Sequence, residues 1–259
     1  AAASGCGALG DNLETAGYMG RCGKAGGGPS DGCSVNVEDI PLPLRDIGNR
    51  WGTCAVVGHA AGVLGGKNGA SIDAHDAVFR VNPLSEELST QVAKVGRRTT
   101  VAVMGREAVD TMLKGTGGFS HAHAADTPYI LFWHYHAAQY LKHLHEEISA
   151  YRGNSTLALM SPALINWQLD VYAKLREDLI RLGLGPLSCP RFMSSGLHAI
   201  LLATQLCRSV NVFGVSVENR SAPKPGAQHS SSISRHSFDA ETMLARLLWM
   251  AGVFDVCTI

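Results

Sequence analysis

Short apolar runs alternate with longer amphipathic stretches between Thr53 and Met250 of this 259-residue chain. Apolar runs that end at glycine or a polar residue are typical of strands buried on both faces of a parallel sheet. Stretches with apolar side chains at helical spacing are typical of helices that cover such a sheet. The expected strands are Cys54–Gly58, Ala77–Val81, Thr99–Met104, Tyr129–Trp133, Thr156–Met160 and Val210–Phe213, and the expected helices are Glu107–Lys114, Ala137–Ala150, Ile165–Leu182, Leu197–Cys207 and Asp239–Met250.

This alternation predicts an α/β fold with a mostly parallel sheet covered by helices on both faces. The chain length allows one large domain and needs no second one. Ligands bind at the carboxyl ends of the strands in sheets of this kind. We therefore expect the functional site in the loops after Gly58, Val81 and Gly214.

The first part of the chain, residues 1–46, has a different composition. It is rich in glycine and alanine, carries Cys6, Cys22 and Cys33, and shows neither a helical nor a strand period. We interpret it as a stem or linker that ends near Pro41 and Pro43. Residues 47–259 are then expected to form the folded domain.

Composition narrows the possible partners and the compartment. The formal net charge is +0 and no charge run is present, which disfavours nucleic acid and acidic membrane surfaces as partners. Seven cysteines without a Cys-x-x-Cys pair disfavour a zinc knuckle and fit an oxidising compartment. The sequons at Asn154 and Asn219 predict N-glycosylation there.

Several histidines lie in pairs two residues apart, as at His134 and His136 or His143 and His145. No acidic or cysteine residues stand near them at the spacing of metal ligands. We expect no metal site from them. No run of about 20 apolar residues is present. The chain begins Ala-Ala-Ala without a methionine, so we expect a fragment or mature form whose membrane anchor lies outside it.

Four blocks of sequence follow one another in a specific order. The first runs from Cys54-Ala-Val-Val-Gly58 through Phe79-Arg80-Val-Asn82 to Thr100, and the second from Ser194-Ser195-Gly196 to Gly214. His229 forms the third, and His236-Ser-Phe-Asp-Ala-Glu241 the fourth. These blocks resemble the large, small, third and very small sialyl motifs of the eukaryotic sialyltransferases.

The resemblance implies a single Rossmann-like domain of the GT-A type. It also implies an inverting glycosyltransferase that moves sialic acid from CMP-sialic acid to a hydroxyl group of a glycan acceptor. No cofactor or metal is expected, because a CMP-sugar has no diphosphate to clamp. The family suggests the Golgi lumen and, for the full-length protein, a type II membrane topology. It also implies a disulfide between Cys54 and Cys207, although two buried free thiols are the alternative.

The resemblance assigns catalytic roles to three residues. His236 is the candidate general base, because histidine titrates near neutral pH. Glu241 would orient its ring, and His229 would contact the leaving phosphate. The alternative makes His236 a residue at a helix N-terminus, Glu241 a first-turn acid favoured by the helix dipole, and His229 a solvated loop residue.

Donor binding falls to a further set of residues. Ser194, Ser195 and Gly196 would present hydroxyl groups and a backbone N–H to an anion at a helix N-terminus, or form a plain N-cap. Asn82 would contact the nucleotide, or serve as a turn residue before Pro83. The remaining expected donor contacts are His59 and Gly214.

Two positions depart from the family pattern. His59-Ala60 stands where the family has Asn and Ser, and serines follow His229 where aromatic residues are usual. Histidine can still donate a hydrogen bond to a phosphate. These departures leave open a CMP-Kdo-type keto-sugar acid as the donor, or a CMP-binding pseudoenzyme without turnover.

Overall fold

A computed structural model describes residues 47, 50–58, 66–83, 91–113, 127–133, 138–151, 154–160, 162–185, 187, 193–215, 217 and 236–257. The described strands are β1 (Trp51–Val57), β2 (Ala77–Val81), β3 (Val101–Met104), β4 (Tyr129–Phe132), β5 (Thr156–Leu159), β6 (Cys207–Phe213) and β7 (Asp255–Val256). They form one seven-stranded sheet in the order β5-β4-β3-β2-β1-β6-β7, and every neighbouring pair is parallel. The expected α/β fold is confirmed.

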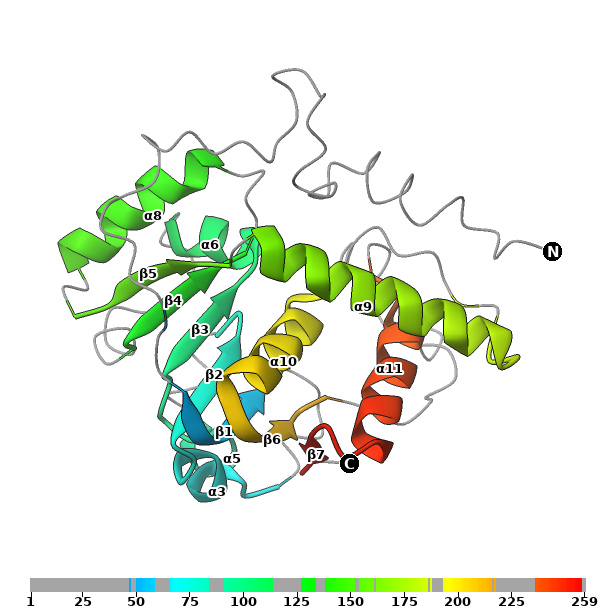
Figure 1. Ribbon diagram of the computed structural model, residues 1–259. Helices are drawn as coiled ribbons and strands as arrows, with labels where there is room; N and C mark the ends of the chain where they lie inside the picture. Colours follow the sequence, from blue (N-terminus) through cyan, green and yellow to red (C-terminus); the bar gives the residue numbers. More distant parts are fainter. Residues whose placement is uncertain are drawn as a thin grey trace, which may run out of the picture.

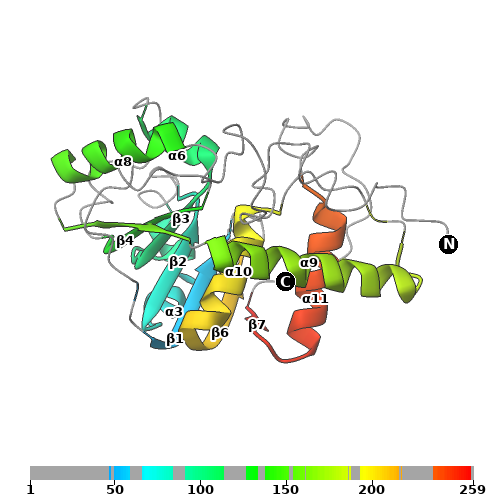
Figure 2. The same cartoon turned by 45° about the horizontal axis from the view of Figure 1, so that its top comes forward.

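Helices cover both faces of this sheet (Figure 1). They are α3 (Gly69–Asp73), α5 (Val92–Val95), α6 (Arg106–Leu113), α8 (Ala138–Tyr151), α9 (Pro162–Arg181), α10 (Ser195–Leu206) and α11 (Phe238–Met250). Figure 2 shows the molecule from a second direction. Here α9 runs across α10 and α11, and the three helices lie on one side of the sheet.

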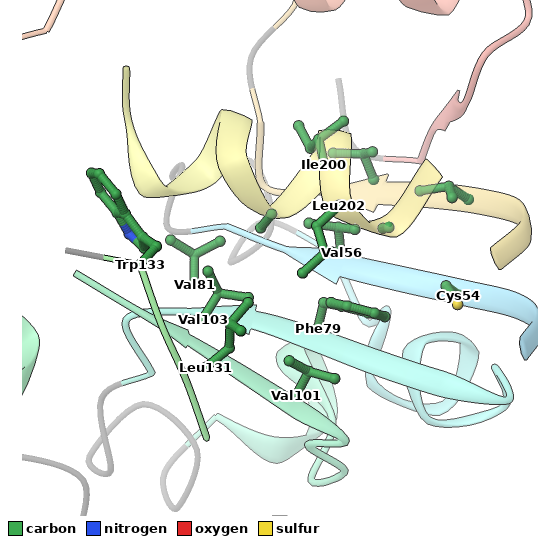
Figure 3. Close-up of a cluster of buried hydrophobic side chains, with 14 of the residues drawn as sticks. Cys54, Val56, Phe79, Val81, Val101, Val103, Leu131, Trp133, Ile200 and Leu202 are labelled. Atoms are coloured by element: carbon green, nitrogen blue, oxygen red, sulfur yellow. The ribbon is translucent and has the colours of Figure 1, made fainter. Parts of the chain in front are cut away.

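Alternate strand residues pack against different helices, because successive side chains of a strand point to opposite faces. Cys54 and Val56 of β1 belong to the large apolar cluster that includes residues of α9 and α10. Figure 3 shows this cluster, in which Leu202 of α10 lies next to Val56 of β1. Ala55 and Val57, which alternate with Cys54 and Val56 along β1, pack on the other face of the sheet. Both faces of the central strands are therefore buried, as their unbroken apolar sequences predicted.

The boundaries differ from expectation in a few places. β1 begins at Trp51 and β6 at Cys207, so Cys207 opens a strand where we expected the end of a helix. The short elements α3, α5 and β7 were not predicted. A helix of one turn or a strand of two residues is too short to produce a recognisable period. Among the described helices, none combines the length and apolar character needed to cross a bilayer.

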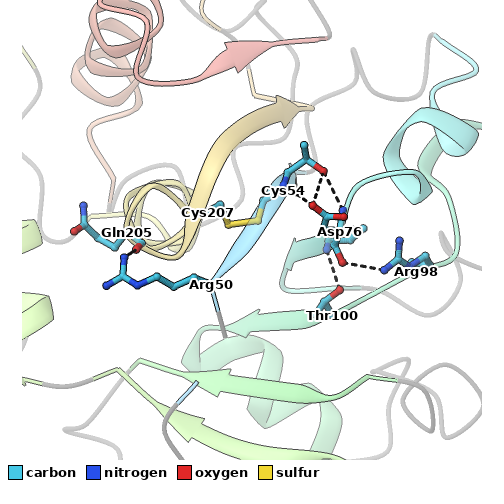
Figure 4. Close-up of a disulfide and its surroundings, with 9 residues drawn as sticks. Arg50, Cys54, Asp76, Arg98, Thr100, Gln205 and Cys207 are labelled. Carbon is cyan, nitrogen blue, oxygen red and sulfur yellow. Dashed lines mark hydrogen bonds between the residues drawn. A yellow bond between two sulfur atoms is a disulfide. The ribbon is translucent and has the colours of Figure 1, made fainter. Parts of the chain in front are cut away.

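A disulfide joins Cys54 of β1 to Cys207 of β6, with the two Cα atoms 6.0 Å apart (Figure 4). This is the pairing that the family resemblance implied. Close to it, the Asp76 carboxylate accepts a hydrogen bond from the backbone N–H of Thr53 at 2.8 Å. This bond lowers the pKa of Asp76.

Candidate active site

The strand order changes direction between β1 and β6. The chain moves from β1 outward to β5, and then returns to place β6 on the other side of β1. Loops leave the sheet in opposite directions at such a switch point, which opens a crevice for ligands at the carboxyl ends of the strands. Gly58 follows β1 there and donates its N–H to the carbonyl of Phe213 at 2.8 Å. A Cβ atom on Gly58 would lie 2.7 Å from the carbonyl oxygen of Gly214, so the two loops start in close contact.

Asn82 lies at the carboxyl end of the neighbouring strand β2, in the left-handed region with a φ of 42°. Asparagine tolerates this conformation better than most residues. Its side-chain oxygen accepts a hydrogen bond from the N–H of Gly105, directly after β3, at 2.8 Å. The amide group is thereby fixed at the sheet edge where the crevice opens.

The N-terminus of α10 reaches this same edge, because α10 leads directly into β6 and runs opposite to it. Ser194 caps the helix, and its hydroxyl oxygen accepts a hydrogen bond from the N–H of Leu197 at 3.2 Å. The Ser195 hydroxyl accepts one from Trp133 Nε1, at the carboxyl end of β4, at 3.1 Å. Gly196 adds no side chain to this first turn. The three residues expected at a helix N-terminus therefore lie there, and Ser194 is the N-cap.

Glu241 of α11 is bonded to this helix end. Its Oε1 accepts a hydrogen bond from the Ser194 N–H at 2.8 Å, and its Oε2 accepts one from the Ser194 hydroxyl. We expected Glu241 to orient His236, but these two bonds tie its carboxylate to Ser194. Burial raises the pKa of Glu241 to about 7, although the bonds from Ser194 lower it. This carboxyl group therefore titrates near neutral pH.

His236 lies just before α11 and is half-buried. Its ring centroid is 5.2 Å from that of Phe238, whose side chain is 45% exposed. His236 also acts on His198 of α10, which is fully buried. Burial, and then the charge of His236, lower the pKa of His198 to about 3, so His198 is neutral.

Buried polar side chains of α9 support these groups. Gln168 Oε1 lies 2.5 Å from His198 Nδ1, and the His198 ring centroid is 4.2 Å from that of Trp133. Arg176 is buried and donates to the hydroxyl oxygen of Ser237 at 3.2 Å. Gln168, Arg176 and His198 were not among the expected site residues. A polar residue on the buried face of an amphipathic helix was the available signal for Gln168 and Arg176.

Three expected site residues, His59, His229 and Asn219, lie outside the described residues. Asn154 is exposed in a turn before β5, which leaves its side chain accessible, and its glycosylation stays a prediction. A surface hollow of about 480 Å³, lined by residues of α6 and α8 that include His143 and Glu146, holds none of the site residues. Those two helices cover the face of the sheet opposite α10.

This chain resembles known proteins in its sequence and in its fold. The sequence matches glycosyltransferase family 29 (sialyltransferase) over residues 36–252. Sialyltransferase-like protein 1 of Oryza sativa subsp. indica is 27% identical over 219 residues, which cover 79% of this chain and 54% of that protein. Beta-1,6-galactosyltransferase GALT29A of Arabidopsis thaliana is 24% identical over 208 residues, which cover 76% of this chain and 50% of that protein. This chain thus spans about half the length of the curated relatives it matches.

One solved structure is a mammalian sialyltransferase in complex with Gal-beta-1-3GalNAc-ortho-nitrophenol. It aligns with a TM-score of 0.59 and 17% identity, covering 96% of this chain and 86% of that one. At this identity the likeness concerns the fold, and it extends over nearly the whole chain.

Proposed function

Because this chain belongs to glycosyltransferase family 29, the sialyltransferases, and is a sialyltransferase-like glycosyltransferase, we propose that it transfers sialic acid from CMP-sialic acid to a glycan hydroxyl with inversion. One observation carries the proposal. Glu241 joins the N-terminal end of α11, where His236 lies, to the capped N-terminus of α10. A candidate base and a candidate anion site are therefore held at one edge of the sheet.

The donor's phosphate would bind at the N-terminus of α10. The N–H groups of a helix's first turn and the helix dipole favour an anion, and Gly196 leaves the backbone of this first turn open to it. Asn82 would contact the nucleotide from the end of β2, and Gly58 and Gly214 would let the chain pass close to it. A single phosphate held by neutral donors needs no metal ion.

The transfer would proceed in one displacement. His236 takes the proton from the acceptor hydroxyl as its oxygen forms a bond to the anomeric carbon. The bond from that carbon to the phosphate oxygen breaks, and CMP leaves with the electron pair. His229 would donate a hydrogen bond to the leaving phosphate.

The acceptor would approach on the side of Phe238. Its exposed ring beside His236 offers an apolar surface to a sugar ring. The mammalian sialyltransferase of similar fold was crystallised with a galactoside. We therefore propose a terminal galactose as the acceptor of this chain.

The Arabidopsis relative supports a second candidate, because its name describes a galactosyltransferase. A chain of this family with an altered donor loop at His59-Ala60 would then use an activated galactose. A CMP-Kdo-type donor and a CMP-binding pseudoenzyme also fit the altered loop.

We place the full-length protein in the Golgi lumen as a type II membrane protein. The disulfide between Cys54 and Cys207 supports an oxidising compartment. The exposed sequon at Asn154 fits the same compartment.

A turnover assay with three donors tests the function. Nucleotide release is measured from CMP-sialic acid, CMP-Kdo and UDP-galactose, with Gal-beta-1-3GalNAc-ortho-nitrophenol as the acceptor. We expect release from CMP-sialic acid, and we expect His236→Ala to lower kcat about 100- to 10,000-fold, as loss of a general base does. His143→Ala, which changes an exposed histidine of α8, serves as the matched control and should leave kcat unchanged.

Three other outcomes would contradict the proposed donor, the proposed base or the proposed activity. Release from UDP-galactose or CMP-Kdo alone would replace the proposed donor. Full activity in His236→Ala would remove this residue from the base role. CMP binding in calorimetry without release from any of the three donors would identify a pseudoenzyme.

A further inference from the structure

Arg176 is a cationic residue in an unusual place. It lies in the second half of α9 with no exposed surface, between apolar positions such as Tyr172 and Leu179 that are buried as well. Arginine is almost never buried completely unless partners compensate its charge. The hydrogen bonds of its guanidinium group therefore indicate what the residue does.

The guanidinium group is held at two separate points. Nη2 donates to the carbonyl oxygen of Leu187 at 2.9 Å, and Nη1 donates to the hydroxyl oxygen of Ser237 at 3.2 Å. The first bond ties the group to the chain beyond the end of α9. The second reaches α11 across a sequence separation of 61 residues.

Ser237 passes the contact on to a carboxylate. The Ser237 hydroxyl donates a hydrogen bond to Asp239 Oδ1 at 2.7 Å. Asp239 Oδ1 also accepts a hydrogen bond from the N–H of Ala240 at 2.9 Å. The hydroxyl group thus accepts from a cation on one side and donates to an anion on the other. Ser237 is fully buried, so water does not compete for these bonds.

We propose that Arg176 is a positioning residue for His236, which directly precedes Ser237. Because its bond to Leu187 fixes the guanidinium group, the bond to Ser237 fixes the position of the Ser237 hydroxyl. The position of Ser237 in turn sets the position of the preceding His236 backbone. The inference rests on the proposed function, because it gives His236 its catalytic purpose. It adds a residue of α9 to a site otherwise built from the sheet edge, α10 and α11.

The charged and titratable groups around this contact come from three helices. Arg176 and Tyr172 belong to α9, Asp239 and Glu241 to α11, and His198 to α10. Burial keeps the pKa of Tyr172 raised and that of His198 lowered, so both are neutral near pH 7. Arg176 is therefore a cation that faces the start of α11 from α9.

Substitutions of Arg176 and Ser237 test the proposal. Arg176→Lys keeps the charge, but a single ammonium group cannot reproduce the two-ended fork. We expect kcat to fall about 10- to 100-fold, as small misplacements of a catalytic group do, with the donor KM little changed. Ser237→Ala should give a similar fall. The double variant should lose no more than either single one, because both remove the same contact.

Arg181 gives a matched control on the same helix. Its guanidinium group is exposed and pairs with Asp178 at 3.1 Å. Arg181→Lys should leave kcat unchanged. The proposal is overturned if the losses in Arg176→Lys and Ser237→Ala multiply, or if activity falls only with the folded fraction measured by circular dichroism. Should Arg176→Lys fail to fold, Ser237→Ala still removes the contact by deleting a single hydroxyl group.

A spectroscopic measurement separates this proposal from the proposed function. The imidazole signals of His236 are assigned by comparison with His236→Ala and followed by NMR without any donor. We expect Arg176→Lys and Ser237→Ala to shift them, and Arg181→Lys to leave them in place. Unchanged His236 signals overturn the positioning role. Shifted signals in a chain that turns over no donor support that role while the proposed transfer fails.

Discussion

At the scale of single residues, Ser194 and Glu241 show how one contact serves stability and site geometry together. Glu241 is buried, and both of its carboxylate oxygens accept hydrogen bonds from Ser194. The Ser194 hydroxyl also accepts the N–H of Leu197, so it acts as donor and cap at once. Changing the charge of Glu241 therefore alters the N-terminus of α10 directly.

Glu241 should make stability depend on pH near neutrality. Its pKa is about 7 when folded and 4.5 without the protein's influence, so between these values only the folded state holds the proton. The free energy of unfolding should fall as pH rises through this window, by about 3 kcal/mol. Glu241→Gln removes the titration and should flatten this part of the curve. Urea unfolding from pH 4.5 to 8 measures both slopes.

The difference between the two curves isolates Glu241. His198, with a lowered pKa, is present in both proteins and contributes the opposite slope, since its stabilisation is lost as pH falls below 6.5. Identical slopes in the wild type and Glu241→Gln would contradict a raised pKa for Glu241.

At the scale of elements, the site depends on how closely β1 and β6 end together. Their register pairs Val57 with Phe213, and Gly58 continues the contact past the last strand residues. The crevice begins where these two loops separate. Any side chain on Gly58 meets backbone, which cannot turn aside as a flexible side chain can.

Gly58→Ala should therefore destabilise the fold. The new Cβ would lie 2.7 Å from the carbonyl oxygen of Gly214, and such overpacking typically costs about 1–3 kcal/mol. Gly196→Ala is the comparison, because its Cβ would come no closer than 3.5 Å to Ser194 Oγ. Replacing a helical glycine with alanine should instead add up to about 1 kcal/mol. If urea unfolding finds the first variant as stable as the second, β1 and β6 do not end in this close contact.

Elements were more predictable than the contacts between them. Each long strand or helix carries its own period, so its type can be predicted without knowing what it packs against. The partner of Glu241 is 47 residues away, and that of His198 is 30 residues away, so no local pattern could pair them. The order of the motifs identified Ser194 and Glu241 as site residues. It predicted that Glu241 would orient His236 of the same motif, whereas its carboxylate is bonded to Ser194.

At the scale of the whole molecule, covalent and chemical features lie at opposite edges of the sheet. Ser194, Glu241 and Asn82 lie toward the carboxyl ends of the strands. Cys207 is the first residue of β6, toward the amino ends. The disulfide thus strengthens the central pair of strands without entering the crevice.

This disulfide also makes the chain a closed ring with two tails. The ring spans a sequence separation of 153 residues and contains β2, β3, β4 and β5. Tension applied to the two ends passes across the sulfur–sulfur bond, so those strands bear none of it and cannot be pulled straight. In an optical trap, the reduced protein should extend about 50 nm further than the oxidised one, at about 3.5 Å for each of these 153 residues. Most of the sheet is therefore shielded from mechanical load by a single covalent bond.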